Sequence, residues 1–413
     1  MGEKMREADM SITFCGLEFE NPFMLSSAPP TATGEMIDRA FDAGWAAVVV
    51  KTVGVKPTPN VRPRFATLEL ENKRSVGFEN IELCTDRALS YWLKEIERIK
   101  KKHPEKILFV SIFGGNMEEW QTAARKVQEA GADGLELNVS CPMMIGASEG
   151  GWGAAVGQSP KLTSIVIQWV KEVSTVPVMT KMTPNVNDIT TIAKVAEEAG
   201  ADALSGINTV SGFMGIDLDT LEPKPSVRGR GTFGGYSGPA IKPIALRCIV
   251  QMAKNTNLPI SGIGGISNWR DAAEFLMVGA STVQLCTAVM YNGYRIIEDL
   301  KSGLKNYLVD KGYNSVQRIL RLALPKIVLH EELDRIYNVI AEIDRKKCVR
   351  CGLCYLVCKD AGYQAIELDR DRWPLVDSEK CDGCSLCFHR CPVLDCIKLE
   401  RKEDLSQPRV FKK

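Results

Sequence analysis

The sequence predicts an α/β fold in which a (β/α)8 barrel, a TIM barrel, precedes a small α+β domain. Two observations predict it. Over about the first 300 residues, eight apolar segments alternate with segments of helical periodicity. Near the C-terminus, eight of the 14 cysteines form two copies of one spaced pattern. We expect the barrel over residues 1–306, a helical connector over 307–343 and the cysteine-rich domain over 344–413.

The eight expected strands are short apolar runs, many of them rich in β-branched residues. They are Phe23–Ala28, Ala46–Thr52, Ile107–Ile112, Gly134–Val139, Pro177–Met182, Ala203–Asn208, Ile260–Ile263 and Thr282–Thr287. The helices between them include Met117–Ala130, Lys161–Val173, Asp188–Ala199 and Trp269–Val278. A glycine follows several helices, and there we expect left-handed caps, at Gly44, Gly131, Gly200 and Gly279. An open, doubly wound sheet is the alternative architecture.

Two connections are longer than a barrel requires. One runs from Gly54 to about Asn80, and the other, rich in Gly and Pro, runs from Val210 to Gly238. Long connections in a compact domain are usually functional. Both follow the carboxyl ends of expected strands, where barrel enzymes place their chemistry, so we expect them to contribute to the site.

The cysteine pattern indicates iron-sulfur chemistry. Each run has the spacing Cys-x2-Cys-x2-Cys-x3-Cys, which is that of a bacterial-type ferredoxin with two [4Fe-4S] clusters. In such domains the fourth cysteine of each run ligates the other cluster. The expected ligands are Cys348, Cys351, Cys354 and Cys358 in the first run and Cys381, Cys384, Cys387 and Cys391 in the second.

Zinc knuckles and a disulfide framework are the alternatives to clusters. Zinc sites usually use spaced pairs of ligands. Disulfides need an oxidising compartment, and the first ten residues do not resemble a signal peptide. The first run departs from the usual pattern because Lys359 follows it, where Pro392 follows the second. Cys396 lies outside both runs, and we expect it to be a buried bystander.

Composition limits the kind of partner. The formal net charge is +1, which argues against nucleic acid or a membrane as an electrostatic partner. No apolar run approaches the ~20 residues of a membrane span. The abundant cysteines without a leader predict a reducing, cytoplasmic location.

Cys141 is the candidate catalytic residue. It lies in the motif Asn138-Val139-Ser140-Cys141-Pro142, which ends the fourth expected strand, before a Gly-rich stretch, Gly146–Gly157, that could act as a lid. A thiol with its ordinary pKa of about 8.5 keeps its proton near neutral pH and can act as a general acid. The alternative is a buried small hydrophobe.

Lys51 and Lys181 lie at the ends of the second and fifth expected strands. A lysine in an apolar strand is costly unless it is paired or functional, so the two predict a site for an anionic or electron-accepting ring. Snorkelling to the barrel rim is the alternative.

Glycines mark a candidate phosphate site. Gly262-Ile263-Gly264-Gly265 ends the seventh strand, and Gln284 to Ala288 ends the eighth, where barrels bind cofactor phosphates. A plain tight turn is the alternative. The Gly229-x-Gly231-x-x-Gly234 match lies in a loop and not between a strand and a helix, so it predicts no dinucleotide-binding domain.

Several motifs resemble the dihydroorotate dehydrogenase-like flavin barrels, and more closely the dihydropyrimidine dehydrogenases, which append a two-cluster ferredoxin domain to such a barrel. They are Asn138–Pro142, Lys181-Met182-Thr183-Pro184-Asn185, Ile207–Gly212, Gly235-Tyr236-Ser237-Gly238, Ser27–Thr31, Asn80–Leu83 and Gly362–Ile366. The likeness covers nearly the whole chain. It implies FMN in the barrel mouth and two [4Fe-4S] clusters.

The resemblance also assigns roles. FMN would be held by Ser26, Ser27, Lys51, Thr52, Lys181, Gly238, Gly264, Gly265, Gln284 and Thr287, with Lys181 near the N1–C2 edge. A flat pyrimidine over the ring would be held by Asn80, Glu82, Asn138, Ser140, Asn208 and Thr209. Cys141 would be the acid that protonates C5 while a hydride reaches C6.

The implied reaction is reduction of uracil or thymine to a 5,6-dihydropyrimidine, an oxidoreductase step on a CH–CH group. The FAD- and NAD(P)-binding half of the larger enzymes is not in this sequence, so a separate electron-input subunit is expected. The expected assembly is a hetero-oligomer, which could be built on a homodimer. The alternatives are a dihydroorotate dehydrogenase-type enzyme, an enzyme for another cyclic amide, and a non-catalytic electron-transfer subunit.

Overall fold

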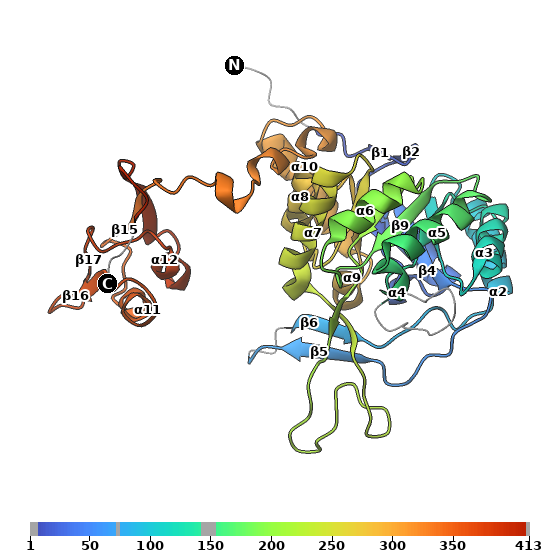
Figure 1. Cartoon of the computed structure of the whole chain (residues 1–413), viewed down its shortest axis with the longest axis horizontal. Coiled ribbons are helices and arrows are strands. Elements are labelled where there is room, and N and C mark those ends of the chain that lie inside the picture. Colours follow the sequence, from blue (N-terminus) through green and yellow to red (C-terminus); the bar gives the residue numbers. More distant parts are fainter. Residues whose placement is uncertain (1–6, 72–74, 142–153, 410–413) are drawn as a thin grey trace. The chain divides into compact units, whose positions relative to one another are not determined.

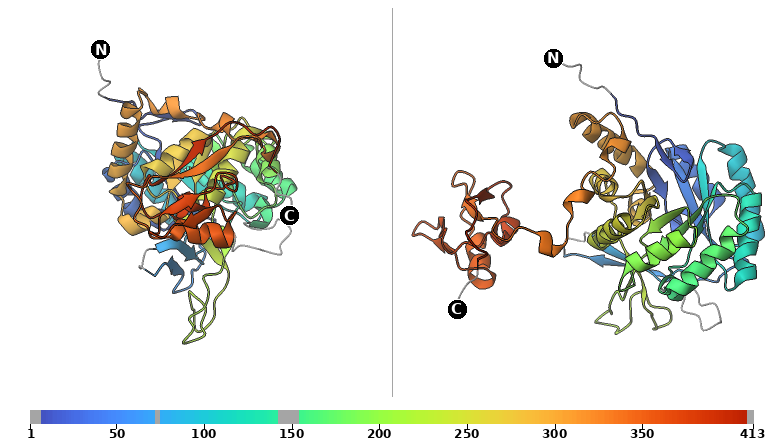
Figure 2. Two further views of the ribbon diagram at one scale, coloured as in Figure 1. Left: turned by 90° about the vertical axis from the view of Figure 1, so that its left-hand side faces the viewer. Right: turned by 45° about the horizontal axis from the view of Figure 1, so that its top comes forward.

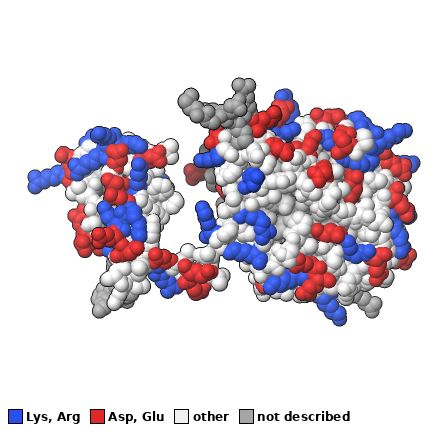
Figure 3. All heavy atoms as spheres, turned by 90° about the horizontal axis from the view of Figure 1, so that it is seen from above, with Lys and Arg blue, Asp and Glu red and all other residues white. Residues whose placement is uncertain are grey.

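The computed structural model describes residues 7–71, 75–141 and 154–409. The chain divides into two compact units between Lys326 and Ile327, and each is described by itself. Among the described residues, no helix is both long enough and apolar enough to cross a lipid bilayer. Positive and negative side chains are interspersed on the face shown in Figure 3.

The first unit is a closed barrel of eight parallel strands. In chain order they are β3 (Phe23–Leu25), β4 (Ala47–Val53), β7 (Ile107–Ile112), β8 (Gly134–Leu137), β9 (Val178–Met182), β10 (Ala203–Gly206), β13 (Ile260–Ile263) and β14 (Thr282–Leu285). The barrel prediction is confirmed, and the open-sheet alternative is wrong. Several strands end two or three residues before their expected bounds, because their polar tips leave the ladder and turn into the site.

Helices surround the barrel (Figures 1 and 2). They are α1 (Gly34–Ala43), α2 (Leu89–Lys102), α3 (Met117–Glu129), α4 (Ala154–Gly157), α5 (Pro160–Lys171), α6 (Ile189–Glu198), α7 (Lys242–Asn255), α8 (Trp269–Val278), α9 (Thr287–Asn292) and α10 (Ile296–Asp310). Side-chain oxygens at Thr33, Asn116, Ser159, Asp188 and Asn268 cap helix N-termini. The four glycines expected after helices all have positive φ, between +91° and +133°.

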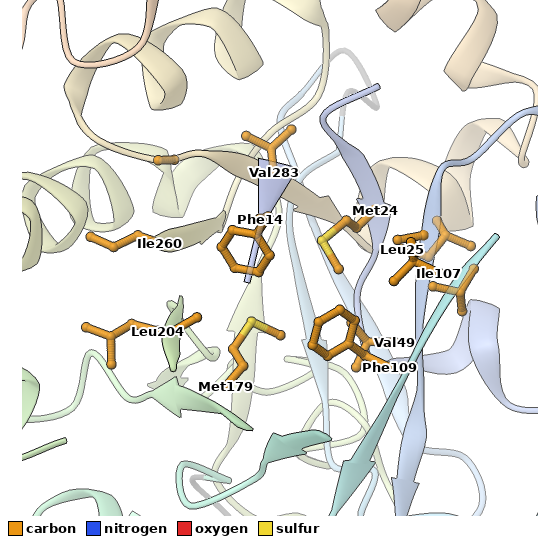
Figure 4. Close-up of a cluster of buried hydrophobic side chains, with 14 of the residues drawn as sticks. Phe14, Met24, Leu25, Val49, Ile107, Phe109, Met179, Leu204, Ile260 and Val283 are labelled. Atoms are coloured by element: carbon orange, nitrogen blue, oxygen red, sulfur yellow. The ribbon is translucent and has the colours of Figure 1, made fainter. Parts of the chain in front are cut away.

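The barrel interior is packed with apolar side chains. Residues Ala47 to Val50 of β4 are all 0% exposed, as expected of a parallel strand covered on both faces. Phe14 of the N-terminal hairpin, β1 (Ile12–Phe14) and β2 (Leu17–Phe19), lies among Met24, Met179 and Phe109 (Figure 4). This filled core leaves only the mouth at the carboxyl ends of the strands for a ligand.

The two long connections form a second sheet. The first contains β5 (Phe65–Glu69) and β6 (Ser75–Asn80), and the second contains β11 (Val210–Gly212) and β12 (Gly234–Ser237). They join in the order β11-β12-β6-β5, all antiparallel, with Asn80 opposite Gly235. We call this four-stranded sheet the roof sheet. Its presence confirms that both connections contribute to the barrel mouth.

Glu79 of β6 is buried at 0% exposure, and its Oε2 accepts a hydrogen bond from the backbone N–H of Met214 at 3.0 Å. Burial raises the pKa of this carboxyl above its ordinary value. A raised folded-state pKa means that ionising Glu79 costs the folded state more than the unfolded state. The destabilisation is absent below the unfolded pKa of about 4.3 and grows as the pH rises from there.

We therefore expect Glu79→Gln, relative to wild type, to become progressively more stable as the pH rises from about 5 to 7. The glutamine carbonyl can still accept from Met214. Thermal denaturation followed by circular dichroism at several pH values checks this. A stability difference that is independent of pH would show that ionisation of Glu79 is not coupled to folding.

Over residues 327–409, the second unit contains two α-helices, one short 3-10 helix and two small sheets. Strand β15 (Val339–Ile343) pairs with β18 (Ile397–Arg401), and β16 (Ile366–Leu368) pairs with β17 (Pro374–Val376), both antiparallel. The helices are α11 (Leu353–Ala361) and α12 (Leu386–Arg390), each beginning inside a cysteine run.

The connector differs from the helix expected over 307–343. Helix α10 continues to Asp310, and beyond it lie three short 3-10 helices, Val316–Ile319, Leu324–Lys326 and His330–Glu332. Gly312, with φ of +79°, follows the end of α10. Val316 and Ile319 are fully buried, and Arg321 N–H donates to the carbonyl of Leu276 in α8. The first part of the connector is therefore packed against the barrel.

Candidate functional site

A pocket opens at the carboxyl ends of the barrel strands and under the roof sheet. All but one of the barrel residues predicted to bind or react line it. They are Ser26, Ser27, Lys51, Thr52, Asn80, Glu82, Asn138, Cys141, Lys181, Asn208, Thr209, Gly238, Gly264, Gly265, Gln284 and Thr287.

Both lysines are buried in the pocket wall and do not reach the rim. Lys51 is 8% exposed and forms an ion pair with Glu82, whose other oxygen accepts from Arg64 Nε at 2.9 Å. Lys181 is 5% exposed and lies 3.3 Å from Glu136 Oε1 and 3.5 Å from Ser26 Oγ. Each ammonium therefore has one carboxylate partner.

Glu136 was not among the predicted site residues. It is 0% exposed on β8, and its second oxygen accepts from Ser205 Oγ at 2.9 Å. An acidic residue inside an apolar strand was the signal that could have identified it, by the same reasoning that singled out the lysines. It fixes the ammonium of Lys181 at the floor of the pocket.

Hydroxyls and amides form one wall. Thr52 Oγ1 lies 3.1 Å from Ser27 Oγ and 3.0 Å from Ser111 Oγ, and it accepts from Asn138 Nδ2 at 2.9 Å. Gln284 Nε2 donates to Ser261 Oγ at 3.1 Å. The carbonyl oxygens Asn138 Oδ1 and Gln284 Oε1 are buried without a hydrogen-bond partner among the described residues. Such groups are costly unless a ligand supplies a donor.

Three glycines in the pocket wall, Gly238, Gly264 and Gly265, allow a ligand to approach the backbone closely. Gly264 and Gly265 have φ of +124° and +77°, and a Cβ at Gly265 would lie 2.6 Å from the backbone nitrogen of Lys242. Gly238 has φ of +92°. Only glycine accommodates these conformations without strain, so the backbone itself lines this part of the site.

The roof sheet and the tip of β10 supply polar groups on the side of the pocket that faces the roof sheet. Asn80 Nδ2 donates to the carbonyl of Gly235 at 3.2 Å. Asn208 Nδ2 donates to Ser140 Oγ at 2.9 Å. Ser140 is 0% exposed and is the one predicted contact that does not line the pocket. It lies behind Asn208, since it accepts from the Asn208 amide without lining the pocket itself.

Three thiols line the pocket: Cys84, Cys141 and Cys286. Burial raises the pKa of Cys84 to about 12, and that of Cys286 also to about 12. Thiols with such pKa values are poor proton donors at neutral pH. Cys141 follows the tip of β8 and is 7% exposed. Residues 146–153 of the expected lid lie outside the described residues, and its end forms α4.

The second unit contains two cavities, of about 340 and 370 Å³. The first cavity is lined by Cys348, Cys351, Cys354 and Cys391, together with Cys396. The second cavity is lined by Cys358, Cys381, Cys384 and Cys387. Each cavity thus combines three cysteines of one run with the fourth of the other, which is the crossed arrangement of two-cluster ferredoxins.

Backbone N–H groups point at the cysteine sulfurs. Arg350 N–H donates to Cys348 Sγ at 3.4 Å, Ala365 N–H to Cys358 Sγ at 3.3 Å and Ala341 N–H to Cys381 Sγ at 3.5 Å. Among the described residues, no three Cys, His, Asp or Glu side chains converge closely enough to hold a single ion. Cysteines around a wider cavity fit a cubane, whose four irons spread the ligands apart.

The chain matches two family models. The description "Dihydroorotate dehydrogenase" covers residues 9–308, and "4Fe-4S dicluster domain" covers residues 341–399. The first match spans the barrel and its roof sheet. The second spans both cysteine cavities.

Curated relatives align over most of the chain. The "NAD-dependent dihydropyrimidine dehydrogenase subunit PreA" of Escherichia coli K12 is 47% identical over 399 residues, 96% of each chain. The chloroplastic "Dihydropyrimidine dehydrogenase (NADP(+))" of Arabidopsis thaliana is 39% identical over 84% of each chain. The catalytic subunit of "Dihydroorotate dehydrogenase B (NAD(+))" from Thermococcus kodakarensis is 38% identical, covering 78% of this chain and 100% of the relative.

Proposed function

This chain belongs to the dihydroorotate dehydrogenase family, with a 4Fe-4S dicluster domain after the barrel, and from that premise we propose that it is the pyrimidine-reducing subunit of an NAD(P)-dependent dihydropyrimidine dehydrogenase. The enzyme class is that of an oxidoreductase acting on a CH–CH group. The observation that carries the proposal is one pocket in which two lysines, two acceptor amides and Cys141 surround a space for stacked rings.

The cofactors of this family are FMN in the barrel and, with the second unit, two [4Fe-4S] clusters. The residues present fit them. The buried oxygen Gln284 Oε1 has no hydrogen-bond donor among the described residues, the glycine backbone accommodates a phosphate, and the crossed cysteines surround two cavities. We assign the FMN contacts to the ten residues named from the resemblance. When bound, FMN supplies the hydride that reaches C6 of the pyrimidine.

Lys181 holds its positive charge at the floor of the pocket, where it would stabilise negative charge on a bound, reduced FMN. Glu136 Oε1 holds the ammonium in position at 3.3 Å, and Ser205 Oγ in turn donates to Glu136 Oε2 at 2.9 Å. A charge held in advance stabilises such a state without reorganisation during the reaction. Lys51 is also buried and ion-paired, with Glu82, on the neighbouring wall of the pocket.

The pyrimidine contacts we propose are the amides and hydroxyl of Asn80, Asn138, Asn208 and Thr209. An amide side chain offers both a donor and an acceptor, which matches the alternating N–H and C=O edge of uracil. Ser140 orients Asn208 from behind. Glu82 lines the same wall, but both of its oxygens already accept from Lys51 and Arg64, so its contribution is to position those cations.

Cys141 is the proposed general acid for C5. It lines the pocket beside Asn138 and near the strand tips. Cys84 and Cys286 line the same pocket, and burial raises the pKa of each to about 12, which makes them poor proton donors near neutral pH.

We propose that electrons enter from a partner subunit that binds FAD and NAD(P), with the cysteine-rich unit as their entry point. The Escherichia coli relative is named as a subunit, which implies a partner for it. Two flavins in separate subunits cannot exchange a hydride through protein, so single-electron carriers between them are needed. We therefore expect a hetero-oligomer in the reducing cytoplasm.

The test is anaerobic turnover of the purified holoprotein with a chemical electron donor. We expect uracil or thymine to be reduced and dihydroorotate to react far more slowly. Orotate carries a carboxylate, and each lysine ammonium on the pocket wall already has a glutamate as its ion-pair partner, which leaves neither available to pair with that carboxylate. Preferential turnover of dihydroorotate would replace the proposal with the dihydroorotate dehydrogenase alternative. Absence of flavin from the protein would favour the electron-transfer alternative.

We expect Lys181→Met to destabilise the protein by about 3–5 kcal/mol, because it leaves Glu136 buried without its counter-charge. The double variant Lys181→Met/Glu136→Gln should recover most of that stability but not the turnover. Chemical denaturation and uracil reduction, measured on both variants, separate the structural role from the functional one. Normal turnover in the double variant would remove Lys181 from the mechanism.

A further inference from the structure

Three arginines converge on the surface beside the first cysteine cavity. Arg350 lines that cavity, and Nη2 of Arg372 would lie 3.2 Å from a Cβ at Gly352, which is another residue of the cavity wall. The guanidinium carbons of Arg345 and Arg350 lie 5.6 and 5.2 Å from the centroid of the Trp373 ring. We call the three arginines and Trp373 the arginine face.

The positive charge of the arginine face is not balanced by ion pairs. Among the residues that the structure describes, the ion pairs of the second unit are Lys380–Asp377, Arg401–Asp404 and Lys402–Glu400. None of these pairs includes an arginine of the face. Asp369 directs its Oδ1 to the backbone N–H groups of Asp371 and Trp373. Guanidinium groups that stack on an aromatic ring in this way can still bind a carboxylate of another protein.

The first cavity reaches the surface at the arginine face. Cys351, an expected cluster ligand next to Arg350 in the sequence, is exposed, and Val349 is 62% exposed. An exposed ligand gives another protein a short path for an electron into the cluster. Arginine and aromatic side chains are also enriched in protein interfaces. The composition of the face therefore fits a protein partner.

The second cavity provides an internal comparison, because its run also exposes one cysteine, Cys384. Between its first two cysteines the first run has Val349-Arg350, and the second run has Asp382-Gly383 at the same positions. Asp382 lines the second cavity, and no Lys or Arg among the described residues does so. The two exposed cysteines therefore differ in the charge beside them, and only the first has the positive charge that suits an acidic partner.

We propose that the arginine face is the docking surface for an acidic face of the electron-input subunit, so that electrons enter the protein at the cluster of the first cavity. The inference rests on the proposed function, because it specifies the partner proposed there. Opposite charges steer two proteins together and fix the orientation in which they dock. One electron then passes from the reduced centre of the donor to the cluster, which oxidises the donor and reduces the cluster.

The experiment compares two donors to the anaerobic full-length holoprotein. The probe is reduced flavodoxin, an acidic one-electron carrier whose own flavin absorbance reports each electron that it loses. The second donor is photoreduced 5-deazariboflavin, which is small and uncharged. Transfer is measured without substrate, so the result does not depend on whether uracil is reduced. Uracil turnover with the uncharged donor and iron content are measured beside it.

The variants form a charge series at one position, Arg350→Gln and Arg350→Glu, followed by the double reversal Arg345→Glu/Arg350→Glu. Arg335→Glu is the matched control. Arg335 is an exposed arginine of the same unit that forms no ion pair among the described residues. It precedes β15, whose other end, Ile343, lines the first cavity.

We expect the rate with flavodoxin to fall stepwise through the charge series, and about tenfold in the double reversal, with a weaker dependence on salt concentration. The rate and uracil turnover with the uncharged donor, and the iron content, should stay at wild-type values. Arg335→Glu should match wild type with both donors.

Equal flavodoxin rates in all variants, or no transfer from flavodoxin to the wild-type protein, would overturn the inference. Equal losses with the uncharged donor would also overturn it, since the arginines would then support the cluster or its transfer to FMN. A wild-type rate blocked by inorganic phosphate at constant ionic strength would identify the face as a small-anion site instead. Absence of uracil reduction, with the expected flavodoxin rates, would refute the proposed reaction and leave the docking surface in place.

Discussion

Replacing Cys141 with alanine is expected to slow uracil reduction by about 10²–10⁴-fold, the usual contribution of a positioned general acid. FMN and iron contents should remain those of wild type, because the predicted cofactor contacts lie on other residues. The loss should appear mainly in kcat, since Cys141 acts on a proton and adds little binding. Anaerobic turnover with a chemical reductant, beside flavin and iron analysis, measures both quantities.

Cys84→Ala is the matched control. Cys84 lines the same pocket and is also buried, but its pKa of about 12 makes it a poor donor. We expect this variant to retain most of the turnover. Cys141→Ser should resemble Cys141→Ala, because a hydroxyl is a far weaker acid than a thiol. Wild-type rates in Cys141→Ala, or a comparable loss in Cys84→Ala, would reassign the proton donor.

Replacing Cys391 with alanine is expected to remove the cluster of the first run and to spare the cluster of its own run. This follows from the first cavity, where Cys391 joins Cys348, Cys351 and Cys354. Turnover supported by the electron-input partner should fall to near the detection limit, because one relay site is lost. Iron content and paramagnetic signals of the reduced protein show which cluster is missing.

Cys358→Ala is the reciprocal variant. Cys358 lines the second cavity with Cys381, Cys384 and Cys387, so its loss should remove the other signal. The two variants together should give complementary spectra. If each variant instead lost the cluster of its own run, ligation would be uncrossed and the assignment of the cavities would be wrong.

Much of the barrel could be predicted from the sequence because its signals are local. Apolar strands such as Ile107–Ile112 and Ile260–Ile263 have the observed bounds, and glycine marks the helix ends. The roof sheet could not be predicted. Its strands β6 and β12 pair across more than 150 residues, as Asn80 opposite Gly235 shows. Short polar strands of this kind carry no periodicity strong enough to identify a partner so distant.

The site residues also divide into those that local sequence signals could predict and those whose role depends on distant contacts. Residues at strand tips, such as Lys181 and Gln284, were predictable because parallel strands bring their carboxyl ends to one mouth. What could not be predicted was which side chains meet. The pairing of Glu82 with Lys51, the place of Ser140 behind Asn208, and the place of Cys396 in the wall of the first cysteine cavity all depend on tertiary packing. These contacts distinguish a residue that touches a ligand from one that supports it.

The roof sheet has a consequence for how enzymes of this type diversify. Its strands come from two insertions, which are joined by the hydrogen bonds between β6 and β12. If one insertion were exchanged alone, the strand of the other would lose its pairing partner. Exchanging both insertions together between two relatives should therefore preserve the roof sheet and the place of Asn80 in the pocket wall, whereas exchanging one of them should disrupt both.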